Sequence, residues 1–225
     1  MIRLQNLSKA YVVNGKRKVV ADDITAVFPG RVSVGLLGRN GAGKSSLLRM
    51  IAGTMDPTSG RVTSDGTISW PVGFAGSFHN DLTGAQNTRF VARIYGVEVA
   101  YLLDYVRDFA DLGGHFDLPF RTYSSGMRSR LAFGVSMGVG FDTYLVDEVT
   151  SVGDAAFKRK SEAVFQERMK TSGAIVVTHS MRMIRRLCSV GAVLENGHLT
   201  LYDDIEEAVA VHERNMSEPA PQAAS

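Results

Sequence analysis

The sequence predicts an α/β fold with a mostly parallel core sheet, an antiparallel β-layer and a small helical lobe. Three patterns carry this prediction. Short apolar strands alternate with helices from residue 31 onward, as in a parallel sheet with both faces covered. Alternating strands near the amino terminus flank an Asn-Gly pair, which is typical of a hairpin. Helical spacing without intervening strands marks the lobe, at about residues 82–137.

The size and composition suit one domain without a disulfide. A chain of 225 residues can form a single large α/β domain, expected over residues 1–213, with a disordered tail at 214–225. A single cysteine, Cys188, excludes an intrachain disulfide. The net charge of +2 gives no support for a nucleic-acid partner. No stretch has the length and apolar character of a membrane span or a signal peptide, so we expect a cytoplasmic protein that reaches the membrane through a partner.

The individual elements follow from local patterns. The β-layer is expected over residues 1–30 because residues 2–4 and 24–28 alternate on either side of Asn14-Gly15. A buried strand at 31–37 precedes a glycine-rich segment, and a helix from 46 stops at Gly53. The later expected elements are strand at 60–72 with a turn at Asp65-Gly66, helices at 82–112 and 123–137, strand at 144–146, helix at 157–169, strand at 174–177, helix at 181–187, and a hairpin of 192–194 and 199–202 that turns at Asn196-Gly197.

The glycine-rich segment predicts a phosphate-binding loop. It is Gly38-Arg39-Asn40-Gly41-Ala42-Gly43-Lys44-Ser45, followed by Ser46. Three glycines let successive N–H groups point inward and form an anion-binding nest. Lys44 can reach the β- and γ-phosphates, and the Ser45 hydroxyl can ligate Mg²⁺. The strand before it and the helix after it supply the context that this motif needs, so the sequence predicts binding of a nucleoside triphosphate such as ATP.

An acidic pair indicates hydrolysis. Asp147 and Glu148 end the short apolar strand at 144–146. The first carboxylate can hold Mg²⁺ through water, and the second can orient the water that attacks the γ-phosphate. The alternative is an acidic pair that merely caps a strand in solvent. A phosphate loop in the same chain favours the catalytic interpretation.

A third motif resembles the signature of ATP-binding-cassette (ABC) ATPases. Tyr123-Ser124-Ser125-Gly126-Met127 is similar to the Leu-Ser-Gly-Gly-Gln of that family. A serine hydroxyl and free N–H groups at a helix N-terminus form an anion site. The resemblance implies that Ser124, Ser125 and Gly126 contact the γ-phosphate held by a second subunit. A plain helix N-cap is the alternative for the motif taken alone.

Further family elements follow in order. Residues 150–154 match the D-loop, whose aspartate, Asp154, the resemblance places at the dimer interface. His179 corresponds to the switch histidine that contacts the γ-phosphate. Tyr11 stands where the family has an aromatic residue that stacks on adenine; a core tyrosine is the competing interpretation, and the two remain open. The resemblance covers most of the chain, from Tyr11 to His179, and implies an ATPase that uses ATP and Mg²⁺.

Departures from the family pattern indicate a branch. Tyr123, Ser125 and Met127 are unusual in the signature, and Val149 stands where most relatives have proline. Together with the D-loop these departures resemble ABC ATPases that export capsule, O-antigen or teichoic acid, and the capsule type fits best. The glutamine that normally precedes the helical lobe is absent from residues 72–79; Gln86 comes too late, and His79 is a substitute candidate.

The resemblance implies a set of partners. We expect a homodimer of ATPase subunits on integral-membrane permease subunits, at the cytoplasmic face of the inner membrane, together with envelope-spanning polysaccharide export proteins and no nucleic acid. Permease docking is expected on the lobe at 82–122. A small-solute importer, a soluble ABC-type ATPase and a regulatory binding module are the alternatives. Arg182, Arg185 and Arg186 form either a contact surface or a solvated helix face.

Overall fold

The computed structural model describes residues 1–13, 15–73, 76, 78–147 and 155–217. Among these residues the chain divides into two compact units. The first contains residues 1–68, 142–147 and 172–217. The second takes its described residues from 69–141 and 155–171. Each unit has its own hydrophobic core.

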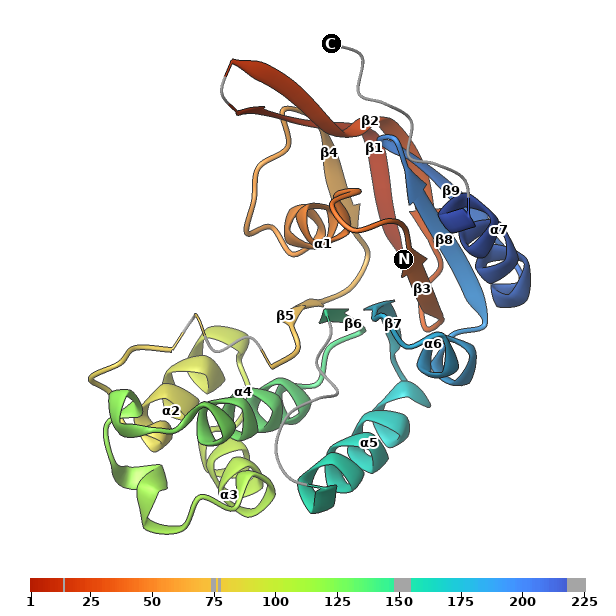
Figure 1. Ribbon diagram of the computed structural model, residues 1–225. Helices are drawn as coiled ribbons and strands as arrows, with labels where there is room; N and C mark the ends of the chain where they lie inside the picture. The colour runs from red at the N-terminus through yellow and green to blue at the C-terminus, as the bar shows by residue number, and fades with distance from the viewer. Residues whose placement is uncertain (14, 74–75, 77, 148–154, 218–225) are drawn as a thin grey trace. The chain divides into compact units, whose positions relative to one another are not determined.

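An antiparallel sheet begins the first unit, as the sequence predicted. It contains β1 (Ile2–Val13), β2 (Lys16–Phe28) and β4 (Ser59–Ser64) in the order β2-β1-β4. The long β1–β2 hairpin is drawn in red in Figure 1. Residues of β1 such as Leu4 and Leu7 are buried in a core that they share with α1 (Lys44–Ile51). The sheet therefore covers the helix that follows the phosphate loop.

The core sheet is mostly parallel. Its strands in this unit are β3 (Ser33–Leu37), β6 (Thr143–Asp147), β7 (Gly173–Val177), β8 (Val190–Glu195) and β9 (His198–Tyr202), in the order β6-β7-β3-β8-β9. In the pairings given for the described residues, β3 is parallel to β7 and β8, β6 is parallel to β7, and β9 is antiparallel to β8. The strand β5 (Ile68–Pro71) carries the chain from the first unit to the second. The α/β fold with its parallel sheet is thus confirmed.

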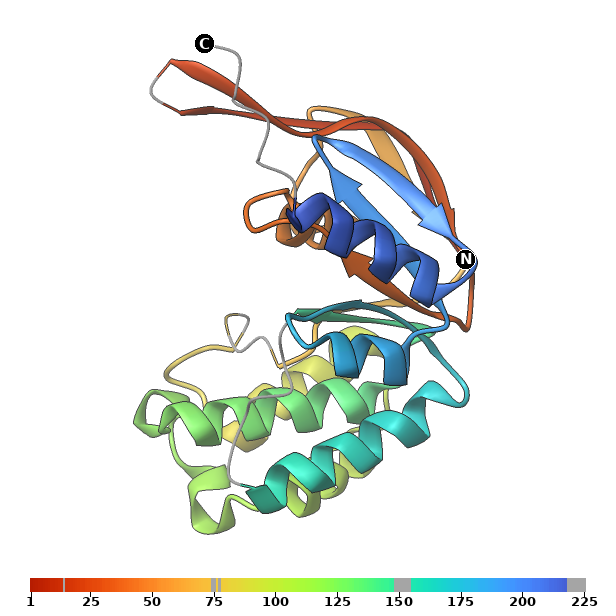
Figure 2. The same ribbon diagram turned by 45° about the vertical axis from the view of Figure 1, so that its right-hand side comes forward.

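Helices cover both faces of this sheet, which explains the continuous apolar strands. Val34 and Leu36 of β3 face the core that contains α1. Between them Gly35 faces α6 (Met181–Leu187) and α7 (Ile205–Ser217), where an added Cβ would lie 3.0 Å from the Cδ1 atom of Ile205. Figure 2 shows α7 lying along the strands on this side. Glycine at this position lets the helix approach the strand closely.

The helix α7 corrects the sequence analysis. No helix was predicted after the final hairpin, and a disordered tail was expected from residue 214. The helix instead runs to Ser217, with Ile205, Ala208 and Val209 buried, and residues 218–225 lie outside the described part. Arg185 of the basic cluster bonds Glu206 and Glu213 of this helix, so that arginine joins α6 to α7.

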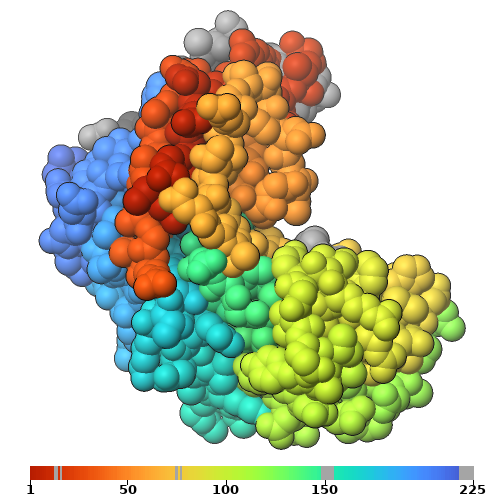
Figure 3. All heavy atoms as spheres, turned by 180° about the vertical axis from the view of Figure 1, so that it is seen from behind, coloured from red at the N-terminus to blue at the C-terminus, as the bar shows by residue number. Residues whose placement is uncertain are grey.

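The second unit is helical. It contains α2 (Gly84–Tyr95), α3 (Val99–Ala110), two 3-10 turns, η2 (Gly113–Asp117) and η3 (Phe120–Thr122), α4 (Ser125–Val139) and α5 (Ala155–Met169). The lobe expected at 82–137 therefore gains α5, whose Lys160 donates to the carbonyl of Phe109 at 3.1 Å. In Figure 3 the side chains of α2 and α3 lie at the surface. Of the helices in the described residues, none is both long and apolar enough to cross a bilayer.

Candidate functional site

The phosphate loop lies between β3 and α1, and its backbone has the conformation that the motif requires. Gly41 and Gly43 have φ values of +77° and +111°, which glycine adopts without strain. A Cβ on Gly43 would lie only 2.8 Å from that of Val20, so the loop also needs glycine for space. The ammonium of Lys44 donates to the carbonyls of Gly38 at 2.6 Å and Arg39 at 3.0 Å. These bonds hold the lysine across the loop.

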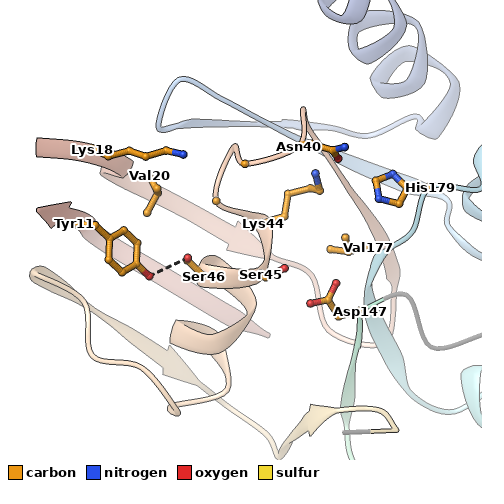
Figure 4. A pocket seen from close by; sticks show the side chains of 12 residues that line it. Tyr11, Lys18, Val20, Asn40, Lys44, Ser45, Ser46, Asp147, Val177 and His179 are labelled. Carbon is orange, nitrogen blue, oxygen red and sulfur yellow. Dashed lines mark hydrogen bonds between the residues drawn. The ribbon is translucent and has the colours of Figure 1, made fainter. Parts of the chain in front are cut away.

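The predicted residues of the first unit meet at one edge of the sheet. The loop follows β3, Asp147 ends β6, and His179 comes two residues after the end of β7. Because β6, β7 and β3 are adjacent and parallel, their carboxyl ends lie together, where α/β folds bind ligands. Figure 4 shows the resulting pocket of about 500 Å³. It is lined by Tyr11, Lys18, Val20, Asn40, Gly41, Gly43, Lys44, Ser45, Ser46, Asp147, Val177 and His179.

Tyr11 lies at one end of this pocket, and its ring is held in place. The hydroxyl is 3.0 Å from the Oγ atom of Ser46 and donates to the sulfur of Met55 at 3.2 Å. The ammonium of Lys9 lies 5.4 Å from the ring centre, and it also donates to the carbonyl of Asp56 at 2.7 Å. The ring is only half-buried. A half-buried, fixed aromatic ring at the edge of a nucleotide-sized pocket can serve as a stacking surface.

The pocket is also lined by Lys18 and Val20 of β2, which were not predicted from the sequence. A signal for Lys18 was present. A two-residue turn at Asn14-Gly15 pairs residue 11 with residue 18, and the structure has this register, with Tyr11 opposite Lys18. Applying the hairpin register to Tyr11 would have found the lysine.

The helix α7, which was not predicted, also reaches the phosphate loop. The guanidinium of Arg39 donates to the carbonyl of Asn215 at 2.7 Å. The amide of Asn215 in turn donates to Glu195 at 3.2 Å. Near these residues, burial lowers the pKa of His212, and the charge of Lys44 lowers it further. The end of α7 thus supports the loop from the side of Arg39.

The signature motif lies in the second unit, at the start of α4. The Oγ atom of Ser124 accepts from the N–H of Met127 at 3.3 Å, so Ser124 is the N-cap of this helix. Ser125 and Gly126 form the first turn. In a single chain, therefore, the motif forms the helix N-cap that was the alternative interpretation. It is compatible with an anion site, because the first-turn N–H groups of a helix lack partners within that helix.

The stretch that lacks the usual glutamine has a local structure of its own. The N–H of His79 donates to Asn87 at 2.9 Å, and Asn87 donates back to the carbonyl of His79 at 3.1 Å. The Nδ1 atom of His79 accepts from the N–H of Asp81 at 3.2 Å. Gln86 forms a capping box with Thr83 at the start of α2. Gln86 thus caps a helix, and His79 remains the candidate to replace the missing glutamine.

Two predicted residues, Glu148 and Asp154, lie outside the described part of the chain. Their roles remain predictions. Ala42, which does not line the pocket, donates its N–H to the carbonyl of Arg39 at 3.1 Å and closes the turn of the loop.

The donor set of the pocket fits a nucleotide with Mg²⁺. The left-handed glycines leave a cradle that a Cβ would fill, and Lys44 supplies a positive charge beside it. Ser45 and Asp147 bring two oxygen ligands to the same pocket. Mg²⁺ is usually held by one or two carboxylates together with phosphate oxygens and water. These residues could hold the ion in that manner.

The fold and the loop together define a P-loop nucleotide-binding protein. Comparison with known proteins gives the family. The ABC transporter family model matches residues 22–151. The chain is 47% identical over 212 residues to the polysialic acid transport ATP-binding protein KpsT of Escherichia coli, covering 93% of this chain and 95% of that protein. It is 40% identical to the capsule polysaccharide export ATP-binding protein CtrD of Neisseria meningitidis serogroup B, covering 92% and 96%.

The solved structures agree on the fold. The dimeric post-hydrolysis structure of the ATP-binding cassette MJ0796 with ADP and Pi matches with a TM-score of 0.76 and 19% identity, covering 91% of this chain and 99% of that one. The chain belongs to the ABC transporter family and is a nucleotide-binding ATPase of that family. The resemblance seen in the sequence is confirmed.

Proposed function

We propose that this chain is the ATP-hydrolysing subunit of a transporter that exports a capsular polysaccharide across the inner membrane. The observation that carries the proposal is the similarity of this chain to the polysialic acid transport protein KpsT and the capsule polysaccharide export protein CtrD, over more than nine-tenths of each chain. The phosphate loop and Asp147 supply groups that can bind the phosphates and Mg²⁺.

Each residue has a proposed role. Lys44 and the loop N–H groups bind the β- and γ-phosphates, and His179 contacts the γ-phosphate. Tyr11 stacks on the base. Ser45 and Asp147 would hold Mg²⁺, which neutralises charge on the phosphates when bound. Glu148 orients and polarises the attacking water.

Hydrolysis requires two copies of the chain. Each chain has one phosphate loop and one signature motif. We propose that two copies bind ATP head to tail, so that Ser124 and Gly126 of one copy face the γ-phosphate held by the other. Asp154 would lie at that interface. Closure excludes water and completes the site, and hydrolysis reopens the dimer and resets the permease.

The permease is proposed to dock on the helical unit. Phe90 and Ile94 stand one turn apart on α2 and are 55% and 59% exposed. Residues at i and i+4 lie side by side on a helix, and contiguous exposed apolar surface is typical of an interaction site. Through this contact the chain would act at the cytoplasmic face of the inner membrane, with envelope-spanning export proteins as further partners.

The test is a chromosomal Glu148→Gln variant in the native host. We expect slow hydrolysis with retained ATP binding, a stabilised dimer, and accumulation of long-chain, lipid-linked polysaccharide inside the cell with loss from the surface. Fractionation followed by glycan analysis measures this. Glu207→Gln on the exposed side of α7 makes the same charge change outside the site and serves as the control.

Three results would each contradict a part of the proposal. Unchanged ATP turnover in the Glu148→Gln protein would remove Glu148 from the catalytic role. Normal surface glycan despite lost turnover would reject polysaccharide export, and small-solute uptake and then the soluble alternatives would follow. A Lys44→Ala protein with an unaltered dissociation constant for ATP would reject the phosphate-loop assignment itself.

A further inference from the structure

Lys18 shares a wall of the pocket with Tyr11. The two residues are directly opposite each other in the β1–β2 ladder. Residues in such a pair project their side chains from the same face of the sheet. Both side chains line the pocket with the phosphate loop, and Figure 4 shows Lys18 extended toward that loop. The hairpin therefore presents an aromatic ring and an ammonium group side by side.

The ammonium group lies beside the loop backbone. A Cβ on Gly41 would be 3.6 Å from the Nζ atom of Lys18. Gly41 precedes Lys44 by one short turn of the same loop, whose N–H groups form the anion nest. Lys18 thus places its charge beside the N–H groups of the anion nest.

No protein group neutralises this charge in the described chain. Lys9 and Lys44 donate to backbone carbonyls. Lys18, by contrast, has neither a hydrogen bond nor an ion pair within the residues that the structure describes. Of the described residues that line the pocket, Asp147 is the carboxylate and Lys18 and Lys44 are the lysines. A ligand with several negative charges would supply a partner for the Lys18 ammonium.

We propose that Lys18 is a second phosphate-binding lysine of the nucleotide site. Tyr11 and Lys18 then act as a pair across the ladder, the ring for the base and the ammonium for the phosphate chain. This inference rests on the proposed nucleotide site and adds to it a ligand from β2. Because Lys18 is exposed and its charge is screened by solvent, we expect an effect of about ten-fold on affinity.

The experiment compares Lys18→Met with Arg17→Met. Arg17 is the neighbour on the same strand and is paired with Val12, so its side chain leaves the opposite face. Both changes remove one positive charge from an exposed site of the hairpin. Displacement of a fluorescent ATP analogue by ATP, AMP and adenosine is measured at low and high salt, and thermal unfolding checks that each variant is folded.

The expected result separates phosphate from nucleoside. Lys18→Met should weaken ATP binding about ten-fold, AMP binding less, and adenosine binding not at all, and the effect should shrink at high salt. Arg17→Met should match the wild type, and Lys18→Arg should restore most of the ATP affinity.

Other outcomes overturn the inference in different ways. Equal ATP affinity in Lys18→Met and Arg17→Met proteins would reject the phosphate contact. An equal loss for ATP and adenosine would instead assign Lys18 to the nucleoside. In either case a loss of ATP binding in Lys44→Ala would show that the proposed nucleotide site still stands. Retained binding in Lys44→Ala would reject the site as well.

Discussion

Substituting Tyr11 by alanine distinguishes the two interpretations of this residue. If the ring stacks on the base, its removal costs about 1–3 kcal/mol of binding free energy, which weakens ATP binding about 5- to 150-fold. The free energy of unfolding should fall by only about 1–2 kcal/mol. The ring is half-buried, and its polar contacts are one bond with Ser46 and one with the sulfur of Met55.

A core tyrosine would give the opposite pattern. Removing a fully packed aromatic side chain costs about 3–5 kcal/mol of unfolding free energy and would leave ATP affinity unchanged in the folded fraction. The stacking interpretation of Tyr11 is refuted if the alanine variant binds ATP within two-fold of the wild type while its unfolding free energy falls by more than about 3 kcal/mol.

The assay needs two measurements and two further variants. Urea unfolding without nucleotide gives the stability, and displacement of a fluorescent ATP analogue gives the affinity. Tyr11→Phe keeps the ring and loses the hydroxyl, so we expect ATP affinity within about three-fold of the wild type and a stability loss of about 1 kcal/mol. Tyr101→Ala removes a half-exposed tyrosine from α3, away from the phosphate loop in the chain, and should not change affinity.

Two further predictions concern the helical unit. Tyr123→Phe removes the bond to the carbonyl of His115 and should cost about 1–2 kcal/mol in urea unfolding. Burial raises the pKa of Tyr123 to about 12, above the value of about 10 in the unfolded chain. The contribution of the neutral phenol to the free energy of unfolding is therefore complete below pH 10 and is lost as pH rises toward 12. The phenylalanine variant should lack that loss. Ile94→Asp, on the exposed side of α2, should reduce surface glycan while the purified protein keeps its ATP affinity, because the change disturbs only the proposed permease contact; a normal glycan level would move the docking site elsewhere.

Local patterns predicted most of what positions the site. The phosphate loop, its strand and its helix are contiguous in sequence, so spacing and glycine content were sufficient. The meeting of Asp147 and His179 at the carboxyl edge was implied by the family resemblance, and strand order could have predicted it, since both come at the end of a short apolar strand in an alternating β/α order. Parallel order places such ends together without any knowledge of side-chain packing.

What the sequence did not reveal depends on long-range contacts. The apolar positions of α7, at 205, 208 and 209, have the i, i+3, i+4 spacing of a helix, a local signal that was missed, but the groups that they pack against, beside Gly191, are far away in the chain. A Cβ on Gly191 would lie 2.1 Å from that of Ala208. The bond from Arg39 to Asn215 joins residues far apart in the chain. No local pattern of either segment predicts such contacts.

One local structure accounts for both the late glutamine and the tyrosine of the signature. Gln86 caps α2, and the first residue of that helix is Gly84. A Cβ on Gly84 would lie 2.3 Å from the hydroxyl of Tyr123, which instead donates to the carbonyl of His115 at 2.7 Å. A leucine at 123, as in the Leu-Ser-Gly-Gly-Gln signature, would remove one of the two donors to that carbonyl, which also accepts from the N–H of Leu118 at 2.9 Å, and would leave a gap beside the glycine. Glycine at 84 and tyrosine at 123 therefore belong together. Tyr123, which differs from the leucine of the signature, packs against the start of α2, and Ser124 is still the N-cap of α4.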